Sequence, residues 1–331
     1  MYFILNESPL LTRGLVQRTS AKVRLKLVNG ILIIDKPAGI TSHDVVYKVR
    51  RILKTKRVGH TGTLDPFATG VMVILVGQAT RLAQFLDKDV KEYEAVVRFG
   101  FETDTGDRTG VRSAECGVRN EEISSLLVST DWDDIFAGFR GEIEQIPPMY
   151  SAKKVDGKKL YELARKGETV DRKAVNVIIH VLELHESAIR NPRSEFDMLR
   201  IRVACSAGTY IRTLAEDMGR KIGTGAHLSE LRRTAAGKFS ISQAITLEQL
   251  AEMDEPASHL IPMEDAVDHL AKIELNEDRA AKTRNGLSTR VFDRSYMDGE
   301  AVQMLDETKT LIAIGFYDAA ENVVQPKVVL V

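Results

Sequence analysis

Apolar positions in the first two-thirds of the chain alternate between the two-residue period of β-strands and the 3.6-residue period of helices. Short apolar runs predict strands at residues 30–35 and 71–76, and an alternating run predicts a third at 93–99. Thr41 or Ser42 caps a predicted helix between the first two strands. Its apolar face consists of Val45, Val46, Val49, Ile52 and Leu53. From residue 30 onward, the pattern therefore begins with a strand–helix–strand unit.

The pattern continues with short helices and longer strands. It predicts an amphipathic helix around residues 82–86, two short helices followed by a strand that ends near 146, a short helix at 160–164, strands at 175–186 and 195–205, a helix after 209 and a strand at 228–234. Hairpin-like strands beside a strand–helix–strand unit favour an α+β fold. We expect a mixed, largely antiparallel central sheet flanked by helices, and not a doubly wound parallel sheet.

A length of 331 residues is more than one compact core usually needs. We predict a larger domain at residues 29–250 and a second domain at 251–331. Short strands at 310–316 and 323–331 in the second domain are typical of a small β-barrel. Residues 1–28 carry five basic residues and one acid, as a transit peptide or a nucleic-acid-binding arm would. We expect this segment to be a flexible extension.

Composition indicates an ordinary globular protein, with 44% hydrophobic and 28% charged residues. No apolar run approaches the roughly 20 residues that a membrane helix needs. Cys116 and Cys205 are far apart and neither belongs to a CxxC pair, so neither a zinc site nor a disulfide framework is predicted. These features favour a reducing, cytoplasmic location and no membrane partner.

The net charge of −1 hides an uneven distribution of charge. Residues 251–331 hold 8 basic and 16 acidic residues, which leaves 38 basic and 31 acidic residues before them. The first part could attract phosphate groups, although two solvated surfaces would give the same counts. Basic residues also end the helix after Ser42, where they suit the helix dipole. Lys56 and Arg57 lie beyond that helix, so we assign these two residues to RNA. A Lys/Arg-rich, glycine-punctuated segment at about 149–172 reads as a mobile insertion.

The densest cluster of candidate chemistry is GHTGTLDPFATG at residues 59–70. Its glycines permit tight turns, but the Lys-Ser/Thr ending of a phosphate-binding loop is missing, which makes a nucleotide site improbable. Pro66 restricts Asp65 to extended conformations, so the loop could present a fixed carboxylate. The alternative is that Asp65 only begins a turn before Pro66, which is common for Asp-Pro.

A second cluster, GTYIRTL at residues 208–214, stands between a predicted strand and a predicted helix. Tyr210 and Arg212 could emerge there at one end of the sheet. An arginine beside a carboxylate favours the charged form of the acid and lowers its pKa. The alternative is an arginine at a helix start that makes a surface ion pair.

These clusters belong to a series of six segments along the chain. In order they are DKPAGITS (35–42), GHTGTLDPFATGVM (59–72), KEYEAVVRFG (91–100), QIPPMYSAKKVDGKKLYELARKG (145–167), GTYIRTLAEDMG (208–219) and LRRTAAGKF (231–239). The series resembles the TruB-type tRNA pseudouridine synthases over roughly residues 29–245. Met72 and Phe99 depart from the family pattern, in which leucine is commoner. The resemblance implies the pseudouridine-synthase fold, with residues 29–250 as the catalytic domain and a PUA-like RNA-binding barrel at 251–331.

The resemblance also implies the catalytic residues. Asp65 would be the essential carboxylate and Arg212 would pair with it. Tyr93 would stack on a flipped base, although its strand position suits core packing equally well without the resemblance.

The implied substrate-binding residues surround these three. His60 would help to evert the nucleotide, Tyr210 and Leu231 would line the pocket, and Lys36 would support the loop or a phosphate. Lys153 and Lys154 belong to the basic insertion, which would fold over the RNA.

The implied reaction isomerises the uridine at position 55 in the T-loop of tRNA, after base flipping. It requires no cofactor and no metal. The tRNA T stem-loop would be the partner of a monomer with no obligate protein partner. A guide-RNA-dependent pseudouridine synthase shares the aspartate motif and is one alternative. An RNA-folding chaperone in which catalysis is incidental is the other.

Overall fold

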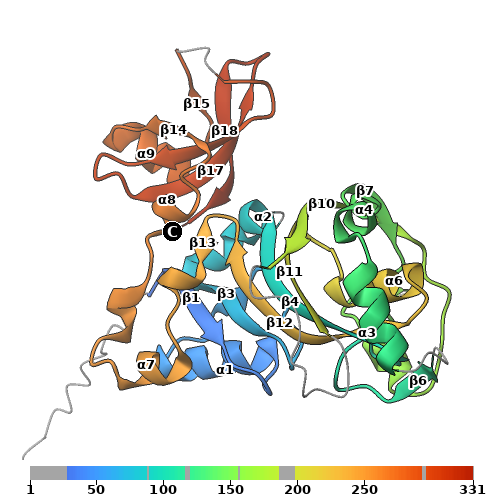
Figure 1. The fold of residues 1–331 in the computed structure, drawn as a ribbon. Coiled ribbons are helices and arrows are strands. Elements are labelled where there is room, and N and C mark those ends of the chain that lie inside the picture. The colour runs from blue at the N-terminus through green and yellow to red at the C-terminus, as the bar shows by residue number, and fades with distance from the viewer. Residues whose placement is uncertain are drawn as a thin grey trace, which may run out of the picture.

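The structure of the protein is a computed structural model that describes residues 28–330, except 88, 116–119, 156, 186–197 and 293–295. The flexible extension expected at residues 1–28 lies outside the described residues apart from Val28. Two bodies are visible, a large one built on a central sheet and a smaller one that holds the C-terminal strands (Figure 1).

The central sheet is mixed and largely antiparallel, as predicted. Its strands, in spatial order, are β1 (Gly30–Lys36), β3 (Thr69–Val76), β12 (Ala226–Ala236), β4 (Lys91–Phe99), β11 (Met198–Cys205), β10 (Val175–Leu184) and β7 (Gly141–Gln145). Strand β2 (Val58–His60) pairs with β3, and β13 (Phe239–Ser240) pairs with β12. Among the described strands of this sheet, β3 and β12 form the parallel pair, through Thr69–Arg232 and Gly70–Arg233. This pair joins the two halves of the sheet.

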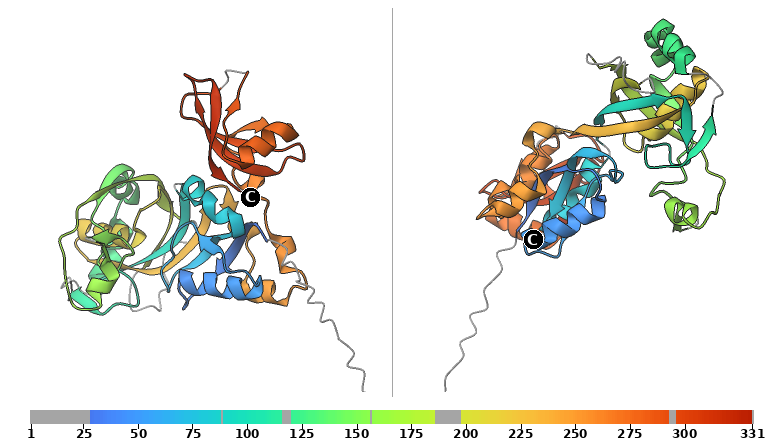
Figure 2. Two further views of the ribbon diagram at one scale, coloured as in Figure 1. Left: turned by 180° about the vertical axis from the view of Figure 1, so that it is seen from behind. Right: turned by 60° about the horizontal axis from the view of Figure 1, so that its bottom comes forward.

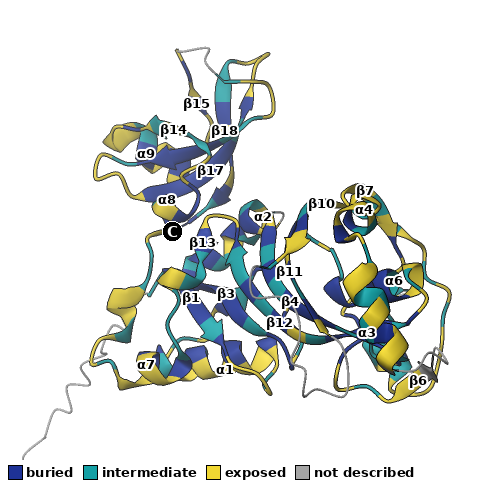
Figure 3. Cartoon of the chain, viewed as in Figure 1, coloured by how far each residue is buried: buried dark blue, intermediate teal, exposed yellow. Residues whose placement is uncertain are grey.

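Helices cover each half of the sheet separately. Helix α1 (Ser42–Ile52) and α7 (Leu247–Glu252) pack on the β1–β3 half, while α3 (Asn120–Ser129), α4 (Trp132–Ala137) and α6 (Ile211–Lys221) lie by the other half (Figure 1). Helix α1 begins with a reciprocal capping box between Thr41 and Asp44, which satisfies its first free N–H groups. Its inner face is buried and its outer face is exposed (Figure 3).

The hydrophobic pattern predicted several short elements incompletely or not at all. A hairpin of β5 (Phe101–Thr103) and β6 (Arg112–Glu115) stands beside α6, and its strands are too short and polar to show alternation. The helix expected around residues 82–86 is present as α2 (Ala83–Leu86), and a 3₁₀ turn, η1 (Gly77–Leu82), precedes it. The insertion contains a small hairpin, β8 (Lys154–Val155) and β9 (Lys158–Lys159), followed by α5 (Leu160–Ala164).

The second body is a curled, half-barrel sheet of five strands, in agreement with the small barrel predicted. Its order is β14 (Ala271–Glu274), β16 (Ala301–Leu305), β17 (Leu311–Asp318), β18 (Val323–Val329) and β15 (Thr289–Arg290), with α9 (Glu277–Arg284) packed on it. The connecting segment contains η2 (Ile241–Gln243), η3 (Pro256–His259) and α8 (Met263–Ala266).

The connecting segment is attached to the first body. Backbone bridges join Ile245 to Ile34 and Ile261 to Ile31. A single buried cluster also runs from β1 and β3 into β17 and β18, so the second body stands directly against the β1–β3 half (Figure 2). We therefore propose a domain boundary near residue 270, where the second sheet begins, and not at 250.

Candidate active site

The loop between β2 and β3 carries Asp65 and is held from two sides. Ser42, at the start of α1, accepts a hydrogen bond from the Leu64 N–H (2.8 Å) and donates one to the Leu64 carbonyl (3.0 Å). Lys36 is fully buried, and its Nζ donates to the carbonyls of Pro37 (2.8 Å), Pro66 (3.3 Å) and Ala68 (2.7 Å). These contacts fix the backbone on both sides of Asp65.

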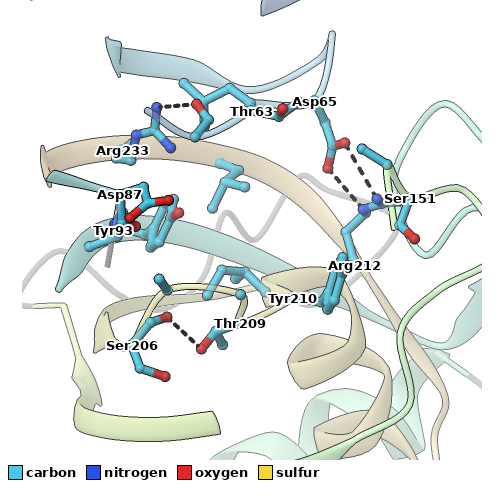
Figure 4. Close-up of a pocket in the computed structure, with 18 residues that line it drawn as sticks. Thr63, Asp65, Asp87, Tyr93, Ser151, Ser206, Thr209, Tyr210, Arg212 and Arg233 are labelled. Atoms are coloured by element: carbon cyan, nitrogen blue, oxygen red, sulfur yellow. Dashed lines mark hydrogen bonds and ion pairs between the residues drawn. The ribbon is translucent and has the colours of Figure 1, made fainter. Parts of the chain in front are cut away.

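The carboxylate of Asp65 faces the guanidinium of Arg212, the second residue of α6 (Figure 4). Arg212 Nε lies 2.9 Å from Oδ2, and Nη2 donates to Oδ1 at 3.4 Å. The remaining N–H groups of Arg212 donate to the carbonyls of Thr105 and Tyr150, each at 2.7 Å. Because its N–H groups have partners on several sides, the buried guanidinium is held in one orientation. It therefore fixes the position of the Asp65 carboxylate.

A second carboxylate, Asp107, stands behind Arg212. Its Oδ1 accepts hydrogen bonds from Thr105 Oγ1 (3.0 Å), the Thr109 N–H (2.8 Å) and Thr109 Oγ1 (2.6 Å). Its Oδ2 lies 3.8 Å from Arg212 Nη1. Arg212 therefore lies between two acids. The sequence analysis missed Asp107, although the run TDTGDRTG at residues 103–110 has the composition of a structured turn.

Burial raises the pKa of Asp65 above its ordinary value, and the positive charge of Arg212 is the largest influence that opposes the rise. Asp107 adds to the rise and Lys36 opposes it. The lowering effect expected of an adjacent arginine is present, but desolvation outweighs it. The Asp65 side chain keeps 32% of its surface open to the pocket, where a reacting group can reach it.

The pocket beside Asp65 has a volume of about 260 Å³. Tyr93 and Leu231, from β4 and β12, form an apolar part of its wall, and Tyr210 lies at the start of α6 (Figure 4). Small-molecule sites commonly measure roughly 300–1,000 Å³, so this pocket is slightly smaller than that range. Its size and its mixture of aromatic and charged groups suit one nucleoside.

Arg233 forms the inner end of the pocket and was not predicted as a site residue. It is 2% exposed, its Nε donates to the Val71 carbonyl (2.6 Å), and its Nη2 donates to the Gly62 carbonyl (3.2 Å). Burial raises the pKa of the neighbouring Tyr93 hydroxyl, and the positive charge of Arg233 opposes that rise. The segment LRRTAAGKF at residues 231–239 contains two adjacent arginines, and the sequence does not show that Arg233 points inward while Arg232 points outward.

Two family models match adjacent parts of the chain. Residues 50–211 match the TruB family pseudouridylate synthase N-terminal domain. Residues 212–268 match the tRNA pseudouridylate synthase B C-terminal domain. The chain belongs to the TruB family. The junction of the two matches falls beside Arg212, at the pocket.

Curated relatives of this TruB-family chain are similar over most of its length. It is 45% identical to tRNA pseudouridine synthase B of Bacillus pumilus over 268 residues, which cover 78% of this chain and 83% of the relative. The corresponding protein of Solibacter usitatus is 43% identical over 307 residues, covering 92% and 100%. A solved Cbf5–Nop10–Gar1 complex contains a chain that is 27% identical, with a TM-score of 0.66, covering 92% of this chain and 86% of that one.

The pocket gathers five of the nine site residues that the sequence predicted in this TruB-family chain. They are Asp65, Tyr93, Tyr210, Arg212 and Leu231. The other four lie outside its lining. Their positions show what each can contact.

His60 and Lys36 lie next to the pocket. His60 is half-buried at the end of β2, where burial lowers the pKa of its ring and Nδ1 has no hydrogen-bond partner. Lys36 lies beneath the Asp65 loop, and its Nζ contacts the carbonyls of Pro37, Pro66 and Ala68. Lys153 and Lys154 lie at the insertion hairpin, next to Ser151 and Ala152, which do line the pocket.

Replacing Lys36 by methionine should lower the turnover number at least about tenfold, because a loop shifted by a fraction of an ångström misplaces Asp65. The affinity for tRNA and its salt dependence should not change, since Lys36 Nζ is buried among carbonyls. Single-turnover kinetics and filter binding at several salt concentrations measure both quantities. A salt slope reduced by about one would instead assign Lys36 to a phosphate.

Proposed function

We propose that this chain isomerises uridine to pseudouridine in tRNA, with the T-loop uridine at position 55 as its target and Asp65 as the catalytic carboxylate. The relatives named tRNA pseudouridine synthase B support the reaction and the class of RNA. The observation that carries the assignment of residues is the Asp65–Arg212 pair at the edge of a pocket of nucleoside size.

No helix among the described residues is long and apolar enough to cross a membrane.

The reaction exchanges one bond of the base for another. The glycosidic bond between N1 and C1′ breaks, the uracil rotates, and C5 bonds to C1′. The proton on C5 then leaves, and N1 ends with a proton, so the product is an isomer of the substrate. Asp65 can add to C6, attack C1′ or deprotonate C2′, and each route requires its ionised form. Arg212 favours that form in a buried site.

The base must leave its stack before it can react. Extrusion costs a few kcal/mol, which contacts in the pocket offset. We assign stacking on the flipped base to Tyr93 and the apolar wall to Leu231. The Tyr93 hydroxyl is the candidate acceptor for the C5 proton, since Arg233 stabilises its anion and opposes the rise in pKa that burial causes.

Tritium release from tRNA labelled at uracil C5 tests the reaction directly. The purified wild-type protein should release one tritium per tRNA, and chemical marking with primer extension should place the product at the T-loop uridine. Release from another uridine would overturn the proposed target while leaving the reaction intact. Absence of release would overturn the reaction.

We also propose that the chain acts alone on the T stem-loop as a monomer. The solved structural neighbours include protein–RNA assemblies, one of them an H/ACA RNP bound to a substrate RNA. In this chain the insertion contributes Ser151 and Ala152 to the pocket that we assign to the flipped base, so a part of its own sequence lies at the proposed site. Full activity of the purified protein on an isolated T stem-loop, without other RNA or protein, is the expected result. A requirement for a guide RNA would contradict it.

The lysines of the insertion should bind phosphate groups of the tRNA backbone. Changing Lys153, Lys154, Lys158 and Lys159 together to alanine should weaken tRNA binding and flatten its dependence on salt, because fewer counterions are released. Filter binding at several salt concentrations provides the measurement. A comparison variant changes the same number of lysines in the acidic C-terminal body, at positions Lys272, Lys282, Lys309 and Lys327, and so separates the contribution of the insertion from that of the C-terminal barrel. An unchanged salt slope in the insertion variant would exclude phosphate contacts by these lysines.

A further inference from the structure

Helix α6 begins without a cap of its own. Its N-cap residue is Tyr210, whose side chain makes no capping hydrogen bond. The residues that cap helices well have short side chains with an oxygen acceptor, and tyrosine is not one of them. Arg212 is the second residue of this helix, so its contact with Asp65 depends on where the helix begins. Another part of the chain must therefore fix the first turn of α6.

That contact comes from Gln145, the last residue of β7. Its Oε1 accepts a hydrogen bond from the Tyr210 N–H (2.9 Å), and its Nε2 donates one to the Tyr210 carbonyl (3.3 Å). The Tyr210 carbonyl also accepts from the Leu214 N–H, which is the first hydrogen bond of the helix. One side chain, 65 positions away in the sequence, therefore holds both backbone groups of the N-cap residue.

Burial makes these two hydrogen bonds hard to replace. Gln145 is 1% exposed, so water has little access to its amide. A buried polar group that loses its partner pays the full cost of its desolvation, which a surface group recovers from water. Among the described residues, Tyr210 supplies all the hydrogen bonds of the Gln145 side chain. The polar function of this side chain is thus directed at the start of α6.

The segment that follows Gln145 makes a second contact with α6. It leads into the insertion, where the Tyr150 carbonyl accepts a hydrogen bond from Arg212 at 2.7 Å. The next residue, Ser151, lines the catalytic pocket. One short segment therefore holds the helix at two points, through the backbone of Tyr210 and through the guanidinium of Arg212, before it reaches the pocket.

We propose that Gln145 is a positioning residue for the reaction, which fixes the start of α6 so that Arg212 meets Asp65 in one geometry. The inference rests on the proposed function, because it gives Gln145 a role through the Asp65–Arg212 pair. Gln145 does not line the catalytic pocket, so it acts through Tyr210 and Arg212 and not on the base. A displacement of reacting groups by about 1 Å can lower a rate roughly 10²-fold, which sets the scale of the expected effect.

Hydrogen–deuterium exchange of the full-length, RNA-free protein, followed by NMR, tests the contact without depending on the reaction. Gln145→Met keeps the approximate length of the side chain and removes both hydrogen bonds. The Tyr210 amide should exchange at least about tenfold faster in this variant, because the partner of its N–H is lost. Gln145→Asn is a second variant, which keeps the amide group but is one methylene too short to reach Tyr210.

Gln303→Met is the matched control. Gln303, in β16, is also fully buried, and its Nε2 donates to the Val267 carbonyl at 2.8 Å. The same substitution there removes a buried amide from the C-terminal sheet, which is far from α6 (Figure 1). The exchange of the Tyr210 amide and the turnover number should equal those of the wild type.

Single-turnover tritium release distinguishes positioning from a merely structural role. Gln145→Met should lower the turnover number about 10- to 10²-fold and leave the affinity for tRNA within a few fold. The acid limb of the pH–rate profile should move to higher pH, because a displaced Arg212 no longer opposes the raised pKa of Asp65 as strongly. Asp107 and Lys36, the other charged groups that act on Asp65, are unchanged in this variant.

Three results would overturn the inference. They are equal Tyr210 exchange in the wild type and both Gln145 variants, wild-type turnover in both variants, and a slower turnover with an unmoved acid limb. The last result would assign Gln145 a merely structural role. Absence of tritium release from the wild type would overturn the proposed function and this role with it, whereas release at equal rates from wild type and variants would overturn this role alone.

Discussion

Replacing Asp65 by asparagine should slow pseudouridine formation by at least about 10⁴-fold, the scale seen when a catalytic carboxylate is removed from an enzyme. Asparagine keeps the shape of the side chain and can still contact Arg212, but it has no anionic form. It can neither add to carbon nor accept a proton. The affinity for tRNA should remain within a few fold, because Asp65 is one small part of a large RNA interface. Single-turnover tritium release and filter binding measure the two quantities.

Asp87→Asn is the matched control for this experiment. Asp87 lines the same pocket, but it does not contact Arg212 in the structure. Its replacement should change the rate less than about tenfold. Retained activity in the Asp65 variant would show that another group performs the chemistry. If neither the wild type nor the variant released tritium while tRNA stayed bound, the chaperone interpretation would stand instead.

Replacing Arg212 by lysine should lower the turnover number by about 10²- to 10³-fold and move the acid limb of the pH–rate profile to higher pH. Lysine keeps a positive charge, but it cannot reach Asp65, Thr105 and Tyr150 at once. Arg212 is the largest influence that lowers the pKa of Asp65, so its loss raises that pKa further. The active, ionised form of Asp65 is then reached only at higher pH.

The pH–rate profile distinguishes this role from a merely structural one. A variant that had only lost rigidity would be slower at every pH and would keep the wild-type acid limb. Arg220→Lys is the matched control, because it removes an arginine from the same helix whose partners are Glu102 and Asp217. Its acid limb should coincide with that of the wild type. Thermal unfolding of each variant verifies that the compared proteins are folded.

The sequence predicted the parts of the site that lie in recognisable motifs. Pro66 and the surrounding glycines made Asp65 a candidate, and the junction of a strand and a helix made Arg212 one. The local pattern left a simple turn and a surface ion pair open as alternatives, and the family resemblance decided between them. The contact between Asp65 and Arg212 joins residues 147 positions apart, and no local pattern encodes it. The family resemblance supplied that pairing, and the structure brings the two side chains together.

The residues that were missed share one physical property. The partners of Arg233 come from distant segments, and Asp107 meets Arg212 only through the fold while its hydrogen bonds are those of a local turn, so both positions read as ordinary polar ones in the sequence. Strands β14, β15 and β16 were missed because they are only two to five residues long. The central sheet was predictable, since its long strands carry the alternating or continuous apolar pattern that burial on one or both faces requires.

The parallel pair of β3 and β12 has a consequence for how activity appears during folding. Asp65 belongs to one half of the central sheet, whereas Tyr93 and Arg212 belong to the other, and the two halves meet where Gly70 lies against Arg233. A Cβ atom on Gly70 would lie 2.2 Å from the Arg233 carbonyl oxygen, so only glycine permits this closure. Joining strands so far apart in the chain is slow, because a long loop must close first. Each half can form its own hairpins early, but neither contains a complete pocket. Recovery of enzymatic activity on refolding should therefore lag behind recovery of secondary structure.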